Sequence, residues 1–503
     1  MVGLNNGWVA RDYRPWSVDQ GYLIPPDLRE WIEADHPVWT IIDVVGQIDT
    51  AAFHARPDHK KSQAGRRGYN PDCLLAVLMY AYAVGERSSR KIEKLCWTDV
   101  AFRIACGNDI PDHSVIARFR QRHDKAFESL FTEILQVCVS AGMGDFSILA
   151  VDGTKIAANA SGFKNRDEDK LLAMAARMEL DEHELARRVR AAMNEAAAVD
   201  AAEDRAERAN PKRPAPVDRT AAIAAALEEI KKNKAERAAN PKPQSVELAR
   251  EQLAASKAHH AGLIAKSEAA HERWRQAAQT GDRSRVGNQP VPTSENKVII
   301  RAARAVANYE QRLAQREAAA KPDRANLTDP QSRMMKTYNS FGQCYNAQLV
   351  VSNDYLIVAA RATNDPTDSA QYQPTMAVAQ AQITTAVRHA GRDDQIGTVL
   401  ADAGYCSNDN LTAQGPDRLI ATTATGKHPP KGPIKDMNAR VAVPEVKALY
   451  RRRAATIEPV NAHLKHRRGL RQFARRGLSA VQGELLLAAA VTNIMRYRVR
   501  RLA

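Results

Sequence analysis

The chain has 503 residues, and because single hydrophobic cores stop growing at roughly 250–300 residues, two or three domains are expected. Its 73 lysines and arginines outnumber its 58 acidic residues, so the formal charge is +15 and favours an anionic partner, nucleic acid before a membrane surface. The longest apolar run, 485–491, covers about a third of a bilayer-spanning helix, and the six cysteines form no CxxC pair. We therefore expect no membrane span, disulfide framework or cysteine zinc site, and reduced thiols indicate the cytoplasm.

The first 145 residues divide into a lead-in and a helical region. Residues 1–65 hold four of the six tryptophans and several prolines, which predicts an ordered but irregular lead-in. Over 66–145, apolar residues recur at helical spacing and predict helices at 71–85, 88–97 and 112–142. These short helices fit a helix-turn-helix DNA-binding domain, and equally a helical bundle with a solvated basic face. The first turns of the last helical segment carry Arg118, Arg120 and Arg122.

Strand patterns begin after the helical region and return late in the chain. A strand is predicted at 146–151, a β-hairpin at 342–363, a helix at 371–389 and a further strand at 398–401. Strand, hairpin, helix and strand in this order indicate an α/β arrangement with a mixed sheet.

The long segment 163–325 separates the first strand from the hairpin. It is rich in Ala, Glu, Lys and Arg and poor in aromatic residues, which predicts long charged helices in a coiled hairpin that projects from the core. Joints are expected near 211–216 and 281–292. DNA contact, dimerisation and a merely solvated insertion all stay open as its role.

Two aspartates end predicted strands, at the edge of an α/β sheet where ligands usually bind: Asp152 and Asp402. Alone, the Asp-Gly pair at 152 is typical of a turn. The letters VDGT also resemble the DxDGT signature of haloacid dehalogenase-like phosphatases, but Ala150 stands where that family has its nucleophile. Asp365 and Asp368 follow the hairpin and are expected to be turn and helix-cap residues.

A third acid stands alone in a basic stretch. Residues 451–476 contain nine lysines and arginines and one acid, Glu458. On a helix, Glu458 and Lys465 face the same way because seven residues separate them. A metal ligand beside a phosphate-binding lysine and an incidental glutamate on a basic surface helix are both compatible with this pattern. Pro459 indicates that a helix either begins there or passes through with a bend.

The stretches VDGTKIAANAS, ADAGYCS and IEPVNAHLKHRRGLRQFARRGL together resemble those of bacterial insertion-sequence transposases with an RNase H-like DDE domain. NLTDPQSRMMKT, YNPDCLLAVLMYAYAVGERSSRKIEKL and PDHSVIARFRQRH extend the similarity over most of 66–500. The resemblance implies an α/β fold: an RNase H-like mixed sheet flanked by helices, with an all-α N-terminal domain and a long helical insertion. The implied divisions are a DNA-binding domain at 66–145, a catalytic domain at 146–162 with 326–480, an insertion at 163–325 and a C-terminal helix at 481–503.

The resemblance also implies a catalytic triad. The family's two aspartates fall on Asp152 and Asp402 and its glutamate on Glu458, which makes these residues the expected ligands of two Mg²⁺ (or Mn²⁺) ions. Asp152 is expected to bridge both ions, with water as the nucleophile for nicking and a 3′-hydroxyl for strand transfer. Tyr450 and Arg453 stand one residue too far upstream of the glutamate to match the family pattern, so their roles stay open.

The expected partner is double-stranded DNA at the element's ends and at the target, bound by a homo-oligomer in the cytoplasm at the nucleoid, with no membrane. A catalytically silent or domesticated DNA-binding protein and a metal-dependent nuclease are the alternatives. Gly153 is expected to serve a turn and Lys155 to meet DNA. Backbone phosphate contacts are expected from basic residues of both helical regions: Lys465, Arg467, Arg468, Arg471, Arg475, Arg476, Arg118, Arg120 and Arg122.

Overall fold

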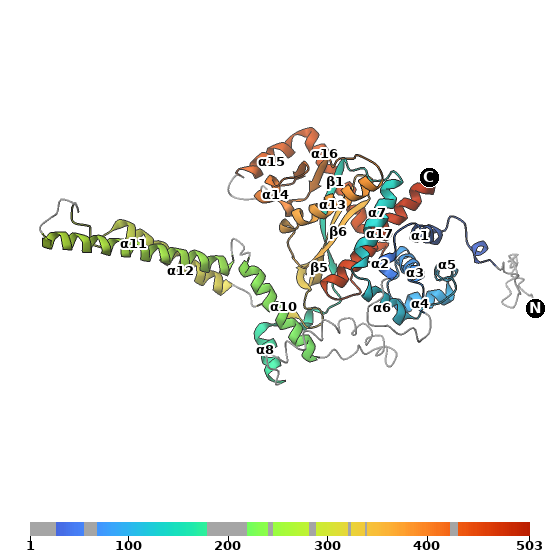
Figure 1. The fold of residues 1–503 in the computed structure, drawn as a ribbon, viewed down its shortest axis with the longest axis horizontal. Helices are drawn as coiled ribbons and strands as arrows, with labels where there is room; N and C mark the ends of the chain where they lie inside the picture. Colours follow the sequence, from blue (N-terminus) through green and yellow to red (C-terminus); the bar gives the residue numbers. More distant parts are fainter. Residues whose placement is uncertain are drawn as a thin grey trace, which may run out of the picture.

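Figure 1 shows a body of sheet and helices from which one pair of long helices projects. The expected joint at 211–216 lies outside the described residues, as does most of the joint at 281–292. The computed structural model describes residues 27–54, 68–178, 219–239, 245–280, 288–319, 323–337, 340–422 and 431–502.

The centre of the body is a mixed six-stranded sheet in the order β4-β5-β1-β7-β8, with β6 also paired to β5. β5 runs antiparallel to β1 and to β6, whereas β7 runs parallel to β1 and β8 runs parallel to β7. The predicted hairpin and both predicted strands are confirmed. The strands are β1 (Ile148–Ala157), β4 (Arg333–Lys336), β5 (Phe341–Ser352), β6 (Ile357–Thr363), β7 (Thr398–Ala401) and β8 (Arg418–Ile420).

Strand β1 is longer than its apolar run predicts. β7 stops at Ala401, opposite Val151, but β5 continues to pair with β1 as far as Ala157. The predicted turn at Gly153 is therefore wrong, because the twelve-residue β5 carries the neighbouring strand onward. Gly153 is required by space: a Cβ there would lie 2.4 Å from the Oδ1 atom of Asp368.

Helices cover both faces of the sheet. Asp152 contacts α16, whereas a side chain at Gly153 would meet Asp368 just before α13, and successive strand residues point to opposite faces. The predicted helix at 371–389 is confirmed as α13, and α16 continues through Pro459 without a break. These helices are α13 (Tyr372–His389), α14 (Asn408–Thr412), α15 (Pro433–Ala442), α16 (Pro444–His466) and α17 (Leu478–Leu502), with short 3-10 turns η3 (Ser369–Gln371) and η4 (Ala403–Tyr405).

Helix α17 packs against β6, α7 and α3. By length and composition it is the one described helix that could cross a membrane, but 78% of its apolar window is buried inside the protein. We therefore interpret α17 as a core helix.

The N-terminal helices share one hydrophobic core with the sheet. Helix α1 lies within the expected irregular lead-in, yet it packs on α3 and α17. The expected helical segment 112–142 breaks at His123 into α6 and α7, and α7 packs on α13. The predicted domain boundary at residue 145 therefore does not separate two hydrophobic cores. The helices are η1 (Leu28–Trp31), α1 (Pro37–Val45), α2 (Ala51–His54), α3 (Pro71–Ala83), α4 (Ser89–Thr98), α5 (Val100–Ala105), α6 (His113–Arg122) and α7 (Ala126–Ser140).

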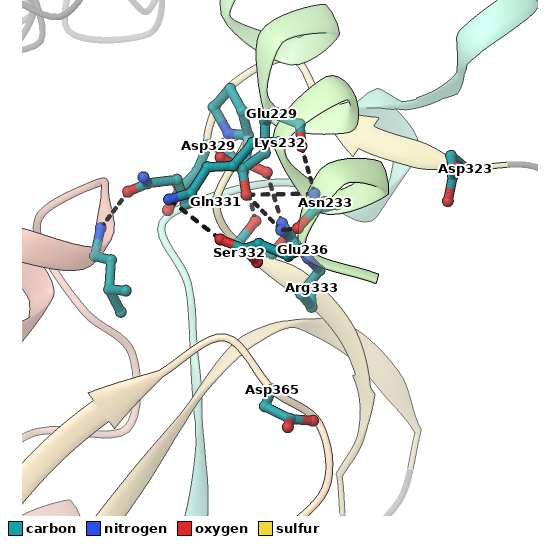
Figure 2. A network of polar contacts seen from close by, with 12 residues as sticks. Glu229, Lys232, Asn233, Glu236, Asp323, Asp329, Gln331, Ser332, Arg333 and Asp365 are labelled. Carbon is teal, nitrogen blue, oxygen red and sulfur yellow. Dashed lines mark hydrogen bonds and ion pairs between the residues drawn. The ribbon is translucent and has the colours of Figure 1, made fainter. Parts of the chain in front are cut away.

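The insertion has a small core of its own and a projecting arm, and the arm confirms the predicted coiled hairpin (Figure 1). Figure 2 shows how its base joins the body: Arg333 on β4 donates hydrogen bonds to Glu229 and Asn233 on α10. Nearby, the Gln331 side chain accepts a 2.6 Å hydrogen bond from Leu478 N at the start of α17. The insertion comprises η2 (Gly162–Lys164), β2 (Asn165–Asp167), α8 (Glu168–Ala176), α10 (Arg219–Ala239), α11 (Val246–Thr280), α12 (Lys297–Ala319) and β3 (Arg324–Asn326).

Candidate active site

Asp152 and Asp402 lie side by side at one edge of the sheet. Val151 and Ala401 form the last pair of the parallel strands β1 and β7, and each aspartate follows its member of that pair. Neighbouring strands are about 4.8 Å apart, so the two carboxyl groups share one location. Asp402 is also fixed by its own turn, where its carboxylate accepts a 2.9 Å hydrogen bond from Gly404 N.

The two carboxyl groups are held in a poorly solvated place. Burial raises the pKa of Asp152 to about 6; Arg453 opposes the shift, and the negative charge of Asp402 adds to it. Burial likewise raises the pKa of Asp402, against the hydrogen bond from Gly404. Two neighbouring acids that resist ionisation are typical of a site built to receive a cation.

Helix α16 closes the site from the opposite side. Asn461 donates a 2.9 Å hydrogen bond to Oδ2 of Asp152, and the Arg453 guanidinium lies 3.9 Å from Oδ1 of the same carboxylate. Tyr450 donates a 3.1 Å hydrogen bond to the carbonyl of Ala401 at the end of β7. Arg453 and Tyr450, whose roles the sequence left open, therefore both lie at this edge. Arg453 contacts the carboxylate of Asp152, and Tyr450 contacts the end of β7.

Glu458 does not join the two aspartates directly. Its side chain is exposed, and it forms no hydrogen bond or ion pair with any described residue. It lies three residues before Asn461 and seven before Lys465, so all three belong to one stripe of α16. Lys465 is half-buried; burial lowers its pKa, while Asp152 acts in the opposite direction. Glu458 thus occupies the outer end of the stripe that faces Asp152.

Asp368 has a role that its expected place as a helix cap does not predict, and its side chain makes no capping hydrogen bond. Its Oδ1 atom accepts hydrogen bonds from Lys155 at 3.1 Å, Asn346 at 2.6 Å and Gln348 at 2.8 Å. Lys155, expected to meet DNA, is therefore held in an ion pair beside the site. The signal was present: β6 runs parallel to β1, so an acid soon after β6 arrives at the same edge as Asp152.

Several arginines expected to meet phosphates are occupied within the protein. Arg120 donates to Ser89 and the carbonyl of Arg87, Arg468 to the carbonyl of Ala83, and Arg475 to Asp124. All three side chains are buried, so we withdraw Arg120, Arg468 and Arg475 as phosphate contacts. The sequence alone does not distinguish these buried arginines from exposed ones, because their hydrogen-bond partners lie far away in the chain. The exposed members of the expected set are Arg118, Arg122, Arg467 and Arg471, and Arg476 is half-buried against the carbonyl of Asn159.

A second acidic group lies among the N-terminal helices. The possible ligand atoms of Glu93, Asp112 and His113 lie within 4.8 Å of one another. The buried His113 contacts Glu93 at 2.6 Å, and Asp112 caps α6 by accepting from Ser114 N. These contacts join α4 to α6, so we interpret the group as structural.

The mixed sheet carries two aspartates with raised pKa values at one edge, next to a helix that bears a third acid and several cations. Carboxylates beside cations are suited to an enzyme that acts on phosphate esters. Two family models match the chain: "Transposase domain (DUF772)" at residues 26–122 and "Transposase DDE domain" at residues 406–498. The two matches support an insertion-sequence transposase, an enzyme that cleaves and joins DNA strands. No curated protein and no solved structure matches it. The second match contains Glu458 and Lys465 but begins after Asp402.

Proposed function

We propose that the transposase activity resides in an RNase H-like catalytic domain. The support is topological: the order β6-β5-β1-β7-β8, with three antiparallel strands followed by two parallel ones, places the ends of β1 and β7 together. The insertion leaves the sheet after β1 and returns before β5, so the edge with Asp152 stays intact.

Asp152, Asp402 and Glu458 are the proposed ligands of two Mg²⁺ or Mn²⁺ ions. The donor set fits hard cations, which prefer carboxylate oxygens. A second observation agrees: Oδ1 of Asn461 is buried beside Asp152 and has no hydrogen-bond partner among the described residues. When bound, such ions activate the attacking water or 3′-hydroxyl and stabilise the leaving oxygen of the phosphodiester.

The chain's own residues prepare that site. Asn461 and Arg453 orient Asp152, and the turn at Gly404 holds Asp402, so neither carboxylate must reorganise when the substrate arrives. The positive charge of Lys465, on the same stripe as Glu458, is suited to a phosphate of the DNA strand. The ion pair with Asp368 holds the Lys155 ammonium group near Asp152 and Asp402, and Asp368 itself is not one of the proposed metal ligands.

Double-stranded DNA is the proposed partner at the element's ends and at the target. The exposed Arg118, Arg122, Arg467 and Arg471 are suited to backbone phosphates, and the N-terminal helices to reading the ends. Because two ends must be brought together, we propose a homo-oligomer on DNA that acts in the cytoplasm at the nucleoid.

The pair Asp152 and Asp402 carries this proposal, and a cleavage assay tests it. The substrate is a duplex containing the DNA that flanks the coding sequence, incubated with Mg²⁺. Asp152→Asn and Asp402→Asn are each expected to slow cleavage and strand joining at least about a thousandfold while metal-free DNA binding persists. The matched control is Asp409→Asn, an exposed acid on α14, which is expected to cleave normally.

The products separate the remaining alternatives. Joined strands in Mg²⁺ support a transposase site, whereas cleavage without joining indicates a nuclease. Binding without either reaction in the wild-type protein indicates a silent copy. Wild-type cleavage by Asp152→Asn would overturn the assignment of the site.

A further inference from the structure

The projecting arm is a two-helix coiled coil formed by α11 and α12. Helix α12 packs against α11. On α12, the buried or half-buried positions 299, 302, 306, 309, 313 and 316 recur every three or four residues, and the half-buried positions 300 and 305 flank them. This spacing is that of a coiled-coil seam, which uses the apolar residues of one helix against the other. The residues on the opposite side of α12 are exposed.

Charge on α12 is divided between its two sides. The acids Glu310 and Glu317 turn toward α11, where they pair with Lys257 at 2.8 Å and Arg250 at 2.7 Å. Four cations lie on the outer stripe instead, and the other polar residues of that stripe, Asn308, Gln311 and Gln315, are neutral. These four are Lys297, Arg301, Arg304 and Arg312, called here the outer cations.

The outer cations are exposed and are not neutralised by described acids. No described residue forms an ion pair with any of them, although Arg312 lies over the ring of Tyr309 at 5.6 Å. From Lys297 to Arg312 the stripe is about 22 Å long, which corresponds to about six base pairs of duplex. A stripe without acids is therefore long enough to follow one DNA strand.

We propose that the outer face of α12 binds the sugar-phosphate backbone of double-stranded DNA outside the catalytic site. This inference rests on the proposed action at DNA ends and adds a second contact with the same class of partner. Charge complementarity favours DNA over another protein copy, because the arm's apolar seam is already used between α11 and α12. Lysine and arginine contacts to phosphates bind without reading the base sequence.

The base of the insertion connects the arm to the catalytic sheet. Arg237 on α10 forms two 2.7 Å hydrogen bonds with the carboxylate of Asp323, directly before β3. The contacts of Arg333 with Glu229 and Asn233 tie α10 to β4 of the catalytic sheet (Figure 2). DNA held by the arm is thereby linked to the sheet through packed and hydrogen-bonded elements.

The test is a salt titration of DNA binding without divalent cations, using a duplex that includes the flanking DNA. Replacing all four outer cations by glutamine should lower the slope of log affinity against log salt by about 3 to 4, since each phosphate contact contributes about 0.9. Between 50 and 200 mM salt, wild-type affinity should then fall about 100-fold more than that of the variant. Glutamine is a good helix former, so the helical signal and melting temperature should be retained.

Two further variants control the comparison. The quadruple variant Arg250→Gln, Lys257→Gln, Glu310→Gln and Glu317→Gln changes the same number of arm residues without changing net charge, and its slope should equal that of wild type. Replacing the three outer arginines by lysine should also preserve the slope, since phosphate contact requires charge.

A wild-type slope in the outer-cation variant would overturn the proposal, as would a lower slope that accompanies dissociation of an oligomer. These outcomes are independent of catalysis, because binding is measured without metal. Failure of the catalytic assignment would appear as normal cleavage by Asp152→Asn.

Discussion

Asn461 on α16 donates a 2.9 Å hydrogen bond to Asp152 on β1, across 309 residues of sequence. The contact fixes the carboxylate that lies beside Asp402 and connects it to the helix that carries Glu458 and Lys465. The residues around Asp152 and those around Asn461 do not predict this hydrogen bond, because nothing in the basic stretch distinguishes Asn461 from its neighbours. Asn461 is thus a positioning residue for the proposed metal site.

Replacing Asn461 by alanine should weaken Mn²⁺ binding roughly 10- to 100-fold, because residues that orient a metal ligand typically contribute that much. Calorimetric titration of Mn²⁺ measures the change directly. Cleavage should recover in part at high Mn²⁺ concentration, which distinguishes lost orientation from a lost ligand. Equal Mn²⁺ affinity in the variant and wild type would remove Asn461 from the site.

Asp152 should make the metal-free protein less stable as pH rises. Its pKa is raised from 3.8 to about 6 in the folded state, so the folded state binds the proton more tightly than the unfolded chain. Stability is then fully present below about pH 4 and is lost as pH rises through about 6. Asp152→Asn should consequently stabilise the protein by about 1 to 3 kcal/mol at pH 7.5 and by little at pH 4.

Denaturant unfolding at the two pH values measures this difference. Mg²⁺ should raise the stability of wild type at pH 7.5 and have a much smaller effect on Asp152→Asn, since binding to the folded state alone stabilises it. An equal change at both pH values would show that the variant acts through packing.

Glu458→Gln should separate catalysis from stability. The side chain is exposed and unpaired among the described residues, so its loss should change the free energy of unfolding by less than about 0.5 kcal/mol. Cleavage in Mg²⁺ should nevertheless fall at least about a hundredfold, because a proposed ligand is removed. Glu445→Gln, an exposed glutamate in the first turn of the same helix, is the matched control. If Glu458→Gln cleaved DNA at the wild-type rate, Glu458 would not be a metal ligand, and the proposed site would consist of Asp152 and Asp402 alone.

The parts of the fold that depend on local pattern were predictable. Apolar periodicity and turn residues located α13, the β5–β6 hairpin and the coiled arm, and the paired strand ends located Asp152 and Asp402. The length of β1 was not predictable, because pairing with β5 extends it beyond its own apolar run.

The role of Asp368 depends on the same kind of distant information. Its position soon after β6 indicates the edge of the sheet at which it lies, but not its partners Lys155, Asn346 and Gln348, which come from β1 and β5. The shared core of the N-terminal helices and sheet likewise arises from α17, which reaches both from the far end of the chain.

Two arginines of the basic stretch should respond oppositely to substitution. Arg475 is buried and donates hydrogen bonds to Asp124 from its two terminal guanidinium nitrogens, Nη1 and Nη2, whereas Arg471 is exposed. Arg475→Ala should lower the free energy of unfolding by about 2 to 3 kcal/mol, because it leaves a partly buried carboxylate without its cation. Arg471→Ala should change it by less than about 0.5 kcal/mol and should weaken DNA binding, with a smaller salt dependence. Denaturant unfolding and metal-free DNA titration of both variants decide the matter. Unchanged stability in Arg475→Ala, together with weaker DNA binding, would return Arg475 to the set of phosphate contacts.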